Sequence, residues 1–190
     1  MRVVCAATAA QLKGRTTDIL LLPERVSRAK LDRAAEACPE AVVIGAIDDG
    51  RSITAYGYHK GREVIRYVKV WPEDPAYVSG RTTQRPLYRF RDVCIGVLIC
   101  RDIDRGEFRA NIVQAVKGST ATKKLICITA DMSADWFPGL RIGPEFDGVH
   151  VLISNKRRWK GVNRCQSFFA TPDRGEVKAV PAGQTLVADL

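Results

Sequence analysis

Histidine and paired cysteines are scarce in this chain of 190 residues. His59 and His150 are its two histidines, and none of its six cysteines forms a Cys-x-x-Cys pair. Structural zinc sites draw their ligands from clustered cysteine and histidine side chains. We therefore expect no metal, and no motif in the sequence points to another cofactor.

Long apolar runs and linkers are also missing. No stretch has the 18 or so apolar residues of a membrane-spanning helix, and residues 1–15 carry one early arginine and only a weak apolar run, unlike a signal peptide. Four of the six cysteines lie in or beside apolar runs, as buried thiols of a reduced protein do; these are Cys5, Cys94, Cys100 and Cys127. The sequence predicts a single cytoplasmic domain, residues 1–190, with no membrane partner.

Acidic residues are fewer than basic ones, 21 against 30, which gives a net charge of +9. The excess is spread over both halves of the chain, and it favours anionic substrates or surfaces. The strongest basic cluster, Lys156–Lys160, could bind a phosphate backbone with Trp159 stacked on a base. Because no other cluster accompanies it, a solvated loop between two strands explains it better, and a nucleic-acid partner is disfavoured.

Short β-branched apolar runs recur along the sequence and predict strands. They cover residues 2–7, 18–22, 41–47, 52–58, 63–70, 93–99, 124–129, 149–154, 166–170 and 176–180. Residues 27–37 and 104–117 have helical patterns, the first opened by Ser27 and the second ended by Gly118. This order predicts an α/β fold in which helices cover one side of strand layers.

Three of the predicted strands have a chemically useful residue at or near their ends. Cys100 follows the run 93–99 at a strand-to-helix elbow, Glu24 follows the run 18–22, and Lys69 lies in the run 63–70. Taken singly, each has a simpler explanation. Cys100 could end a core strand, Glu24 could be a solvated loop carboxylate, and Lys69 could lie on the polar face of a strand. If the strand ends converge on one crevice, however, the carboxylate, ammonium and thiol form an acyl-transfer site.

Four segments resemble the nitrilase superfamily of carbon–nitrogen hydrolases. They are DILLLPE with Glu24, RYVKVWPED with Lys69, VCIGVLICRDIDRGEFR with Cys100, and VLISNKRRWKGVNRCQSFFATPDRGEV. The terminal QTLVADL is similar to the closing strand of that family. The segments follow the family order over nearly the whole chain, and the resemblance implies a shortened αββα sandwich.

The resemblance also implies an activity and the residues that perform it. Cys100 matches the nucleophile, Glu24 the general base and Lys69 the lysine that stabilises the oxyanion. The implied reaction is hydrolysis of a non-peptide carbon–nitrogen bond, in an amide, nitrile or carbamoyl compound, through a thioester. The alternatives are a catalytically silent or nucleic-acid-binding protein on the same scaffold and, less favoured, acyl transfer to an amine.

Three further residues are candidates for substrate binding. Glu73 loosely matches a second glutamate that some family members use, and Arg101 stands where the family usually has an aromatic residue. A guanidinium beside the nucleophile suits a carboxylate-bearing substrate. Trp136 follows a predicted strand and either lines the pocket or packs in the core. A short family member with exposed sandwich faces is expected to form a homo-oligomer.

Overall fold

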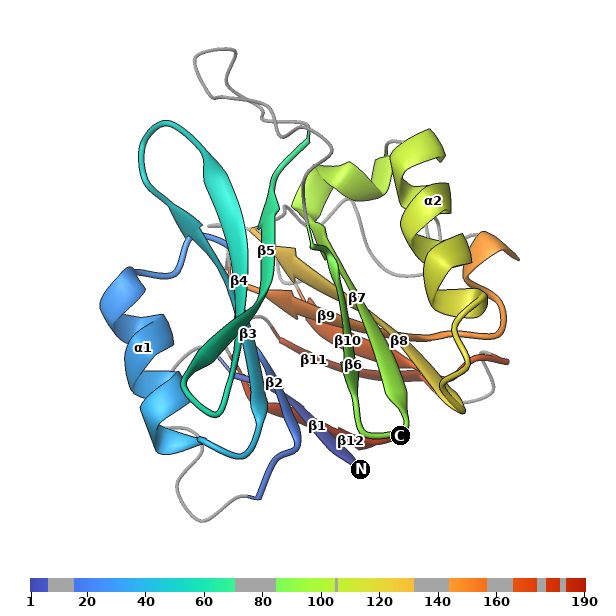
Figure 1. Cartoon of the computed structure of the whole chain (residues 1–190), viewed down its shortest axis with the longest axis horizontal. Helices are drawn as coiled ribbons and strands as arrows, with labels where there is room; N and C mark the ends of the chain where they lie inside the picture. The colour runs from blue at the N-terminus through green and yellow to red at the C-terminus, as the bar shows by residue number, and fades with distance from the viewer. Residues whose placement is uncertain are drawn as a thin grey trace.

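Two six-stranded sheets form the centre of the molecule (Figure 1). The computed structural model describes residues 1–6, 16–70, 85–104, 106–131, 144–156, 166–173, 177–181 and 184–190. The first sheet has the order β12 (Leu186–Asp189), β1 (Arg2–Cys5), β2 (Ile19–Leu21), β3 (Val42–Asp48), β4 (Ile53–His59), β5 (Arg62–Val68). The second has the order β11 (Val177–Pro181), β10 (Gln166–Ala170), β9 (His150–Asn155), β8 (Lys123–Ala130), β7 (Val93–Ile99), β6 (Leu87–Phe90).

Strand direction decides which residues meet at the edges of these sheets. β1, β2 and β3 are parallel in the first sheet, and β7, β8 and β9 are parallel in the second. β4 is antiparallel to both β3 and β5, so β5 runs in the same direction as β2. The carboxyl ends of β2 and β5 therefore lie at one edge of the first sheet, where ligands bind in many α/β proteins.

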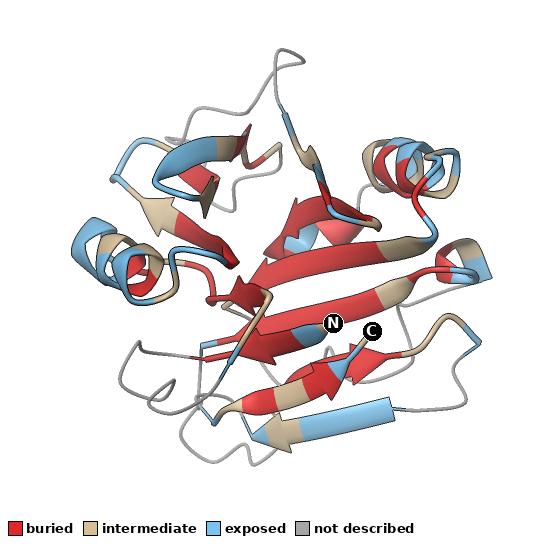
Figure 2. Ribbon diagram, turned by 60° about the horizontal axis from the view of Figure 1, so that its bottom comes forward, coloured by how far each residue is buried: buried red, intermediate tan, exposed pale blue. Residues whose placement is uncertain are grey.

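One helix covers the outer face of each sheet (Figures 1 and 2). Helix α1 (Arg28–Ala37) begins after Ser27, whose Oγ accepts a hydrogen bond from the Lys30 N–H, and it buries Leu31 and Ala34 against the first sheet. Helix α2 (Gly106–Lys117) buries one apolar stripe against the second sheet, formed by Ile112, Val113 and Val116. The αββα layer order confirms the predicted fold class.

The space between the two sheets is filled by side chains from alternate strand positions. The Cys5 thiol of β1 donates a 3.5 Å hydrogen bond to the Ile153 carbonyl of β9, and thus links the layers. Cys5, Cys94, Cys100 and Cys127 are all buried free thiols, as the sequence predicted. Burial raises the pKa of the Cys5 and Cys127 thiols, which keeps them protonated and unreactive.

Most sequence-based boundaries differ from the structure by one or two residues; β5, for example, ends at Val68, so Lys69 lies just beyond the strand and not within it. Two differences are larger. Strand β6 was not predicted, because only four residues form it and its Arg89 is exposed. The helix expected from residue 104 begins instead at Gly106, after a 3-10 turn, η2 (Cys100–Asp104). A second short turn, η4 (Pro144–Phe146), precedes β9. Neither helix of the described ranges is long and apolar enough to cross a membrane.

Gly96 of β7 provides a test of how tightly α2 packs on the second sheet. A Cβ at this position would lie 2.7 Å from Val116 and 2.9 Å from Ile126 side-chain atoms, closer than real contacts allow. We expect Gly96→Ala to lower the free energy of unfolding by about 1–3 kcal/mol, because overpacking displaces the helix. Urea unfolding measures this, with Gly106→Ala as the control, since its added Cβ meets no described atom within 4 Å. Equal losses in both variants would contradict the tight packing.

Candidate functional site

The three chemically useful strand ends come together in the structure. Glu24 follows β2, Lys69 follows β5, and Cys100 follows β7, so the first two residues come from one sheet and the third from the other. The Glu24 N–H donates to the Ala130 carbonyl at the end of β8, which connects the sheets at this edge. We call these three residues the Glu-Lys-Cys cluster.

Glu24 and Lys69 form a buried ion pair. Lys69 Nζ lies 2.9 Å from Glu24 Oε1, and the two side chains are 1% and 2% exposed. Removing both charges from water is costly, and their mutual attraction offsets this cost only when the geometry is close. The backbone holds Lys69 in place, because its N–H donates to the Ile53 carbonyl at 2.7 Å.

Cys100 lies in an elbow between β7 and η2. Its backbone is in the left-handed region, with φ of 46°, which costs a non-glycine residue about 1–2 kcal/mol. The thiol is 1% exposed, hydrogen-bonds to the Glu24 side chain and accepts a hydrogen bond from the Asp131 N–H. Burial, and then the Glu24 charge, raise the pKa of Cys100, while Lys69 lowers it. The resting group is therefore a thiol with a base in contact.

A second left-handed residue supports the carboxylate. Arg25, with φ of 58°, directly follows Glu24, and its Nε lies 3.3 Å from Asp48 Oδ2. The Arg25 carbonyl accepts a 3.0 Å hydrogen bond from Lys156 Nζ, and the Lys156 N–H donates to Ala130. Glu24 is thus fixed by contacts on both sheets. Lys156, which was predicted as part of a basic loop, therefore makes two of these supporting contacts.

Tyr67 and Asp102, which are fully buried beside the cluster, were not predicted from the sequence. The Tyr67 hydroxyl donates a hydrogen bond to Asp102 Oδ2, as does the Val70 N–H at 3.3 Å. Tyr67 stands two residues before Lys69, and Asp102 two residues after Cys100. A tyrosine two positions after Ile65, on the buried face of β5, was the one signal available, because a polar tip at such a position needs a partner.

Of the remaining predicted site residues, Arg101 is the one that the described part of the chain includes. Arg101 follows Cys100 directly, but its side chain is 49% exposed and its Nε lies 4.0 Å from Asp104. Glu73, Trp136 and Trp159 lie outside the described residues. No group of three or more potential metal ligands occurs within the described ranges.

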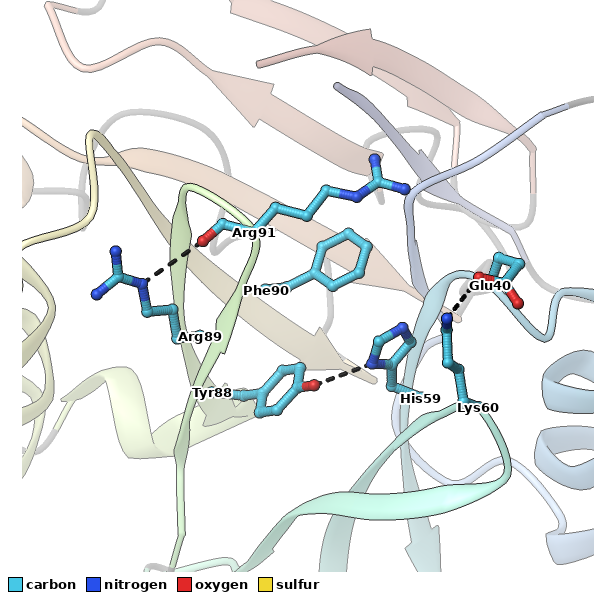
Figure 3. Close-up of a pocket in the computed structure, with 7 residues that line it drawn as sticks. All are labelled: Glu40, His59, Lys60, Tyr88, Arg89, Phe90 and Arg91. Atoms are coloured by element: carbon cyan, nitrogen blue, oxygen red, sulfur yellow. Dashed lines mark hydrogen bonds and ion pairs between the residues drawn. The ribbon is translucent and has the colours of Figure 1, made fainter.

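A cavity of about 240 Å³ lies at the opposite edge of the sandwich, between the β4–β5 and β6–β7 hairpins (Figure 3). The His59 Nδ1 and the Tyr88 hydroxyl, 2.9 Å apart, join the hairpins across it. Two of the cations that line it form ion pairs, Lys60 with Glu40 at 3.1 Å and Arg91 with Asp18 at 2.6 Å. Arg89 hydrogen-bonds to the Thr120 hydroxyl at 2.9 Å. The length of β7, roughly 20 Å, separates this cavity from Cys100. It is therefore distinct from the Glu-Lys-Cys cluster.

The similarity of this chain to known proteins lies in its fold. No family model and no curated protein matches the sequence. Two solved structures of variants of the amidase from Nesterenkonia sp. AN1 each superpose on this chain over 100% of its length, with a TM-score of 0.75. One shows acrylamide added to the active site cysteine (18% identity, 93% of that chain), and the other is in complex with butyramide (17% identity, 90%). A further variant is described as an amidase from the nitrilase superfamily (TM-score 0.74, 17% identity, 100% of this chain and 90% of that chain).

The buried ion pair gives a stability test that needs no substrate. Lys69→Met leaves the Glu24 carboxylate buried without its 2.9 Å partner, and we expect the free energy of unfolding to fall by about 3–5 kcal/mol. Glu24→Gln should also destabilise, because it leaves the ammonium unpaired. The double variant should recover most of the loss in urea unfolding. Additive losses would show that the two groups do not interact.

Proposed function

We propose that this protein is a short member of the nitrilase superfamily that hydrolyses a non-peptide carbon–nitrogen bond in a small molecule. One observation carries the proposal: a buried thiol, carboxylate and ammonium converge from three strands that are far apart in the sequence. The fold shared with amidases of that superfamily supports it, and it favours an amide over a nitrile or carbamoyl substrate.

The first proposed step forms a thioester on Cys100. Glu24, in hydrogen-bond contact with the thiol, takes its proton as the sulfur attacks the amide carbon. The Lys69 ammonium and the Arg101 backbone N–H stabilise the resulting oxyanion, and such a donor contributes about 3–4 kcal/mol. Collapse of the intermediate breaks the carbon–nitrogen bond, and the leaving ammonia or amine takes the proton held by Glu24.

The second proposed step regenerates the enzyme. Glu24 takes a proton from water as the water oxygen attacks the thioester carbon. The carbon–sulfur bond then breaks, the proton held by Glu24 passes to the sulfur, and the products are a carboxylic acid and the Cys100 thiol. The lysine that pairs with Glu24 in the resting site serves the oxyanion again in this step. Arg101, half-exposed beside the nucleophile, suits a substrate that carries a carboxylate. Glu73 and Trp136 remain proposed substrate contacts.

Removing the proposed nucleophile tests this mechanism directly. Cys100→Ala should reduce ammonia release from acetamide, butyramide and succinamate by more than about 10³-fold, because the thioester cannot form. Cys38→Ala, which removes a half-buried thiol beyond the end of α1, is the matched control and should retain the activity. Unchanged hydrolysis by Cys100→Ala would refute the proposal. A panel without turnover by the unaltered protein would favour the catalytically silent alternative.

The charges around Cys100 predict opposite shifts in its titration. The Glu24 carboxylate raises the pKa of Cys100 and the Lys69 ammonium lowers it. Glu24→Gln should therefore move the pH midpoint of Cys100 alkylation by iodoacetamide downward, and Lys69→Met should move it upward. Both variants should lose amide hydrolysis, since the base or the oxyanion donor is gone. Mass spectrometry of the Cys100 peptide measures the alkylation, and shifts of the same sign would contradict the assigned roles.

A further inference from the structure

The carboxylate of Asp102 joins the strand that carries Lys69 to the turn that carries Cys100. Its Oδ2 accepts hydrogen bonds from the Tyr67 hydroxyl and from the Val70 N–H. Both Asp102 and Tyr67 are fully buried, so the contact is shielded from water. A buried carboxyl oxygen that loses such a partner has no water to replace it, so the loss of the contact is costly.

The two donors stand on either side of Lys69 in the chain. Tyr67, in β5, precedes it by two residues, and Val70 follows it directly. The end of β5 is therefore held from both directions by one carboxylate. That carboxylate belongs to η2, the same short turn that begins with Cys100.

The surroundings of this contact are themselves fixed. The Phe108 ring of α2 stacks on the Tyr67 ring at 5.5 Å between centroids, with an interplanar angle of 20°. The Arg109 guanidinium donates to the Ile103 carbonyl in η2 and pairs with Glu145 at 2.7 Å. Both the donor ring and the accepting turn are thus packed against α2, and a shift of either would disturb these contacts.

Simple cohesion does not require a carboxylate here. Apolar side chains of similar volume would hold β5 against η2 without the cost of removing a charge from water. A bond of defined length and direction is what the Tyr67–Asp102 pair adds. The groups whose separation it defines are the Lys69 ammonium on β5 and the Cys100 sulfur on the turn.

We propose that Asp102 and Tyr67 are positioning residues, which set the Lys69 ammonium at the place where it serves both Glu24 and the oxyanion formed at Cys100. The inference rests on the proposed function and deepens it. Neither residue takes part in the proton transfers. Their role is to prevent β5 and η2 from separating, because a misplacement of about 1 Å in such a site can lower the rate roughly 10²-fold.

The decisive variant is Tyr67→Phe, which removes the hydrogen bond without changing a formal charge or the ring that stacks on Phe108. We expect kcat for amide hydrolysis to fall about 10–100-fold with a smaller change in KM. The pH midpoint for alkylation of Cys100 by iodoacetamide should move upward, in the same direction as in Lys69→Met, because a displaced ammonium favours the thiolate less. Tyr88→Phe, which loses a hydroxyl at the opposite edge, is the matched control and should change neither value.

A double-variant cycle separates positioning from general stabilisation. If the two residues act as one unit, Tyr67→Phe combined with Asp102→Asn should be about as slow as Asp102→Asn alone. Lower thermal stability of Tyr67→Phe with an unchanged midpoint and kcat would overturn the positioning role, even if Asp102→Asn fails to fold. If Lys69→Met also leaves the alkylation midpoint of Cys100 and kcat unchanged, the proposed function fails as well. If Lys69→Met changes this midpoint and kcat while Tyr67→Phe changes neither quantity, only the positioning role is wrong.

Discussion

The buried ion pair between Glu24 and Lys69 is the interaction on which the rest of the site depends. The Lys69 ammonium and the Glu24 carboxylate are held 2.9 Å apart with almost no exposure to water, so removing either one leaves its partner buried without a counter-charge. Burial is the main cause that raises the pKa of the Cys100 thiol, and the same pair adjusts it, since the carboxylate raises this pKa further and the ammonium lowers it. The strands that precede these three residues must therefore bring their side chains within hydrogen-bond distance of one another.

Backbone strain shows where that requirement is met. Arg25 and Cys100 both adopt left-handed conformations, and they adjoin or belong to the Glu-Lys-Cys cluster. Two further left-handed residues, Lys60 and Arg91, occupy hairpin turns, where this conformation is ordinary. At Cys100, by contrast, a buried strand ends at the bend, and the strain turns the thiol toward Glu24. Strained residues of this kind persist only where their surroundings hold them.

Periodicity and turn residues were sufficient to predict most of the fold. The boundaries of β7 and β10 match the predicted runs, and in β7 the reason is a run of apolar, mostly β-branched or aliphatic residues. The short edge strand β6 and the 3-10 turn after Cys100 were missed, because tertiary contacts define both. Glu24, Lys69 and Cys100 were found as strand ends, although their convergence followed only from the family resemblance. The Tyr67–Asp102 contact joins residues 35 positions apart and left no local pattern.

The cluster takes its members from both layers of the sandwich. Glu24 and Lys69 follow strands of the first sheet, and Cys100 follows a strand of the second. The distances within the cluster therefore depend on how one sheet is positioned over the other. Apolar packing between sheets tolerates small sliding movements, whereas hydrogen bonds and ion pairs of about 3 Å do not. If one sheet slid past the other, the cluster would lose its chemistry while every strand remained intact. The reactivity of Cys100 therefore reports the relative position of the two sheets more sensitively than the secondary-structure content does.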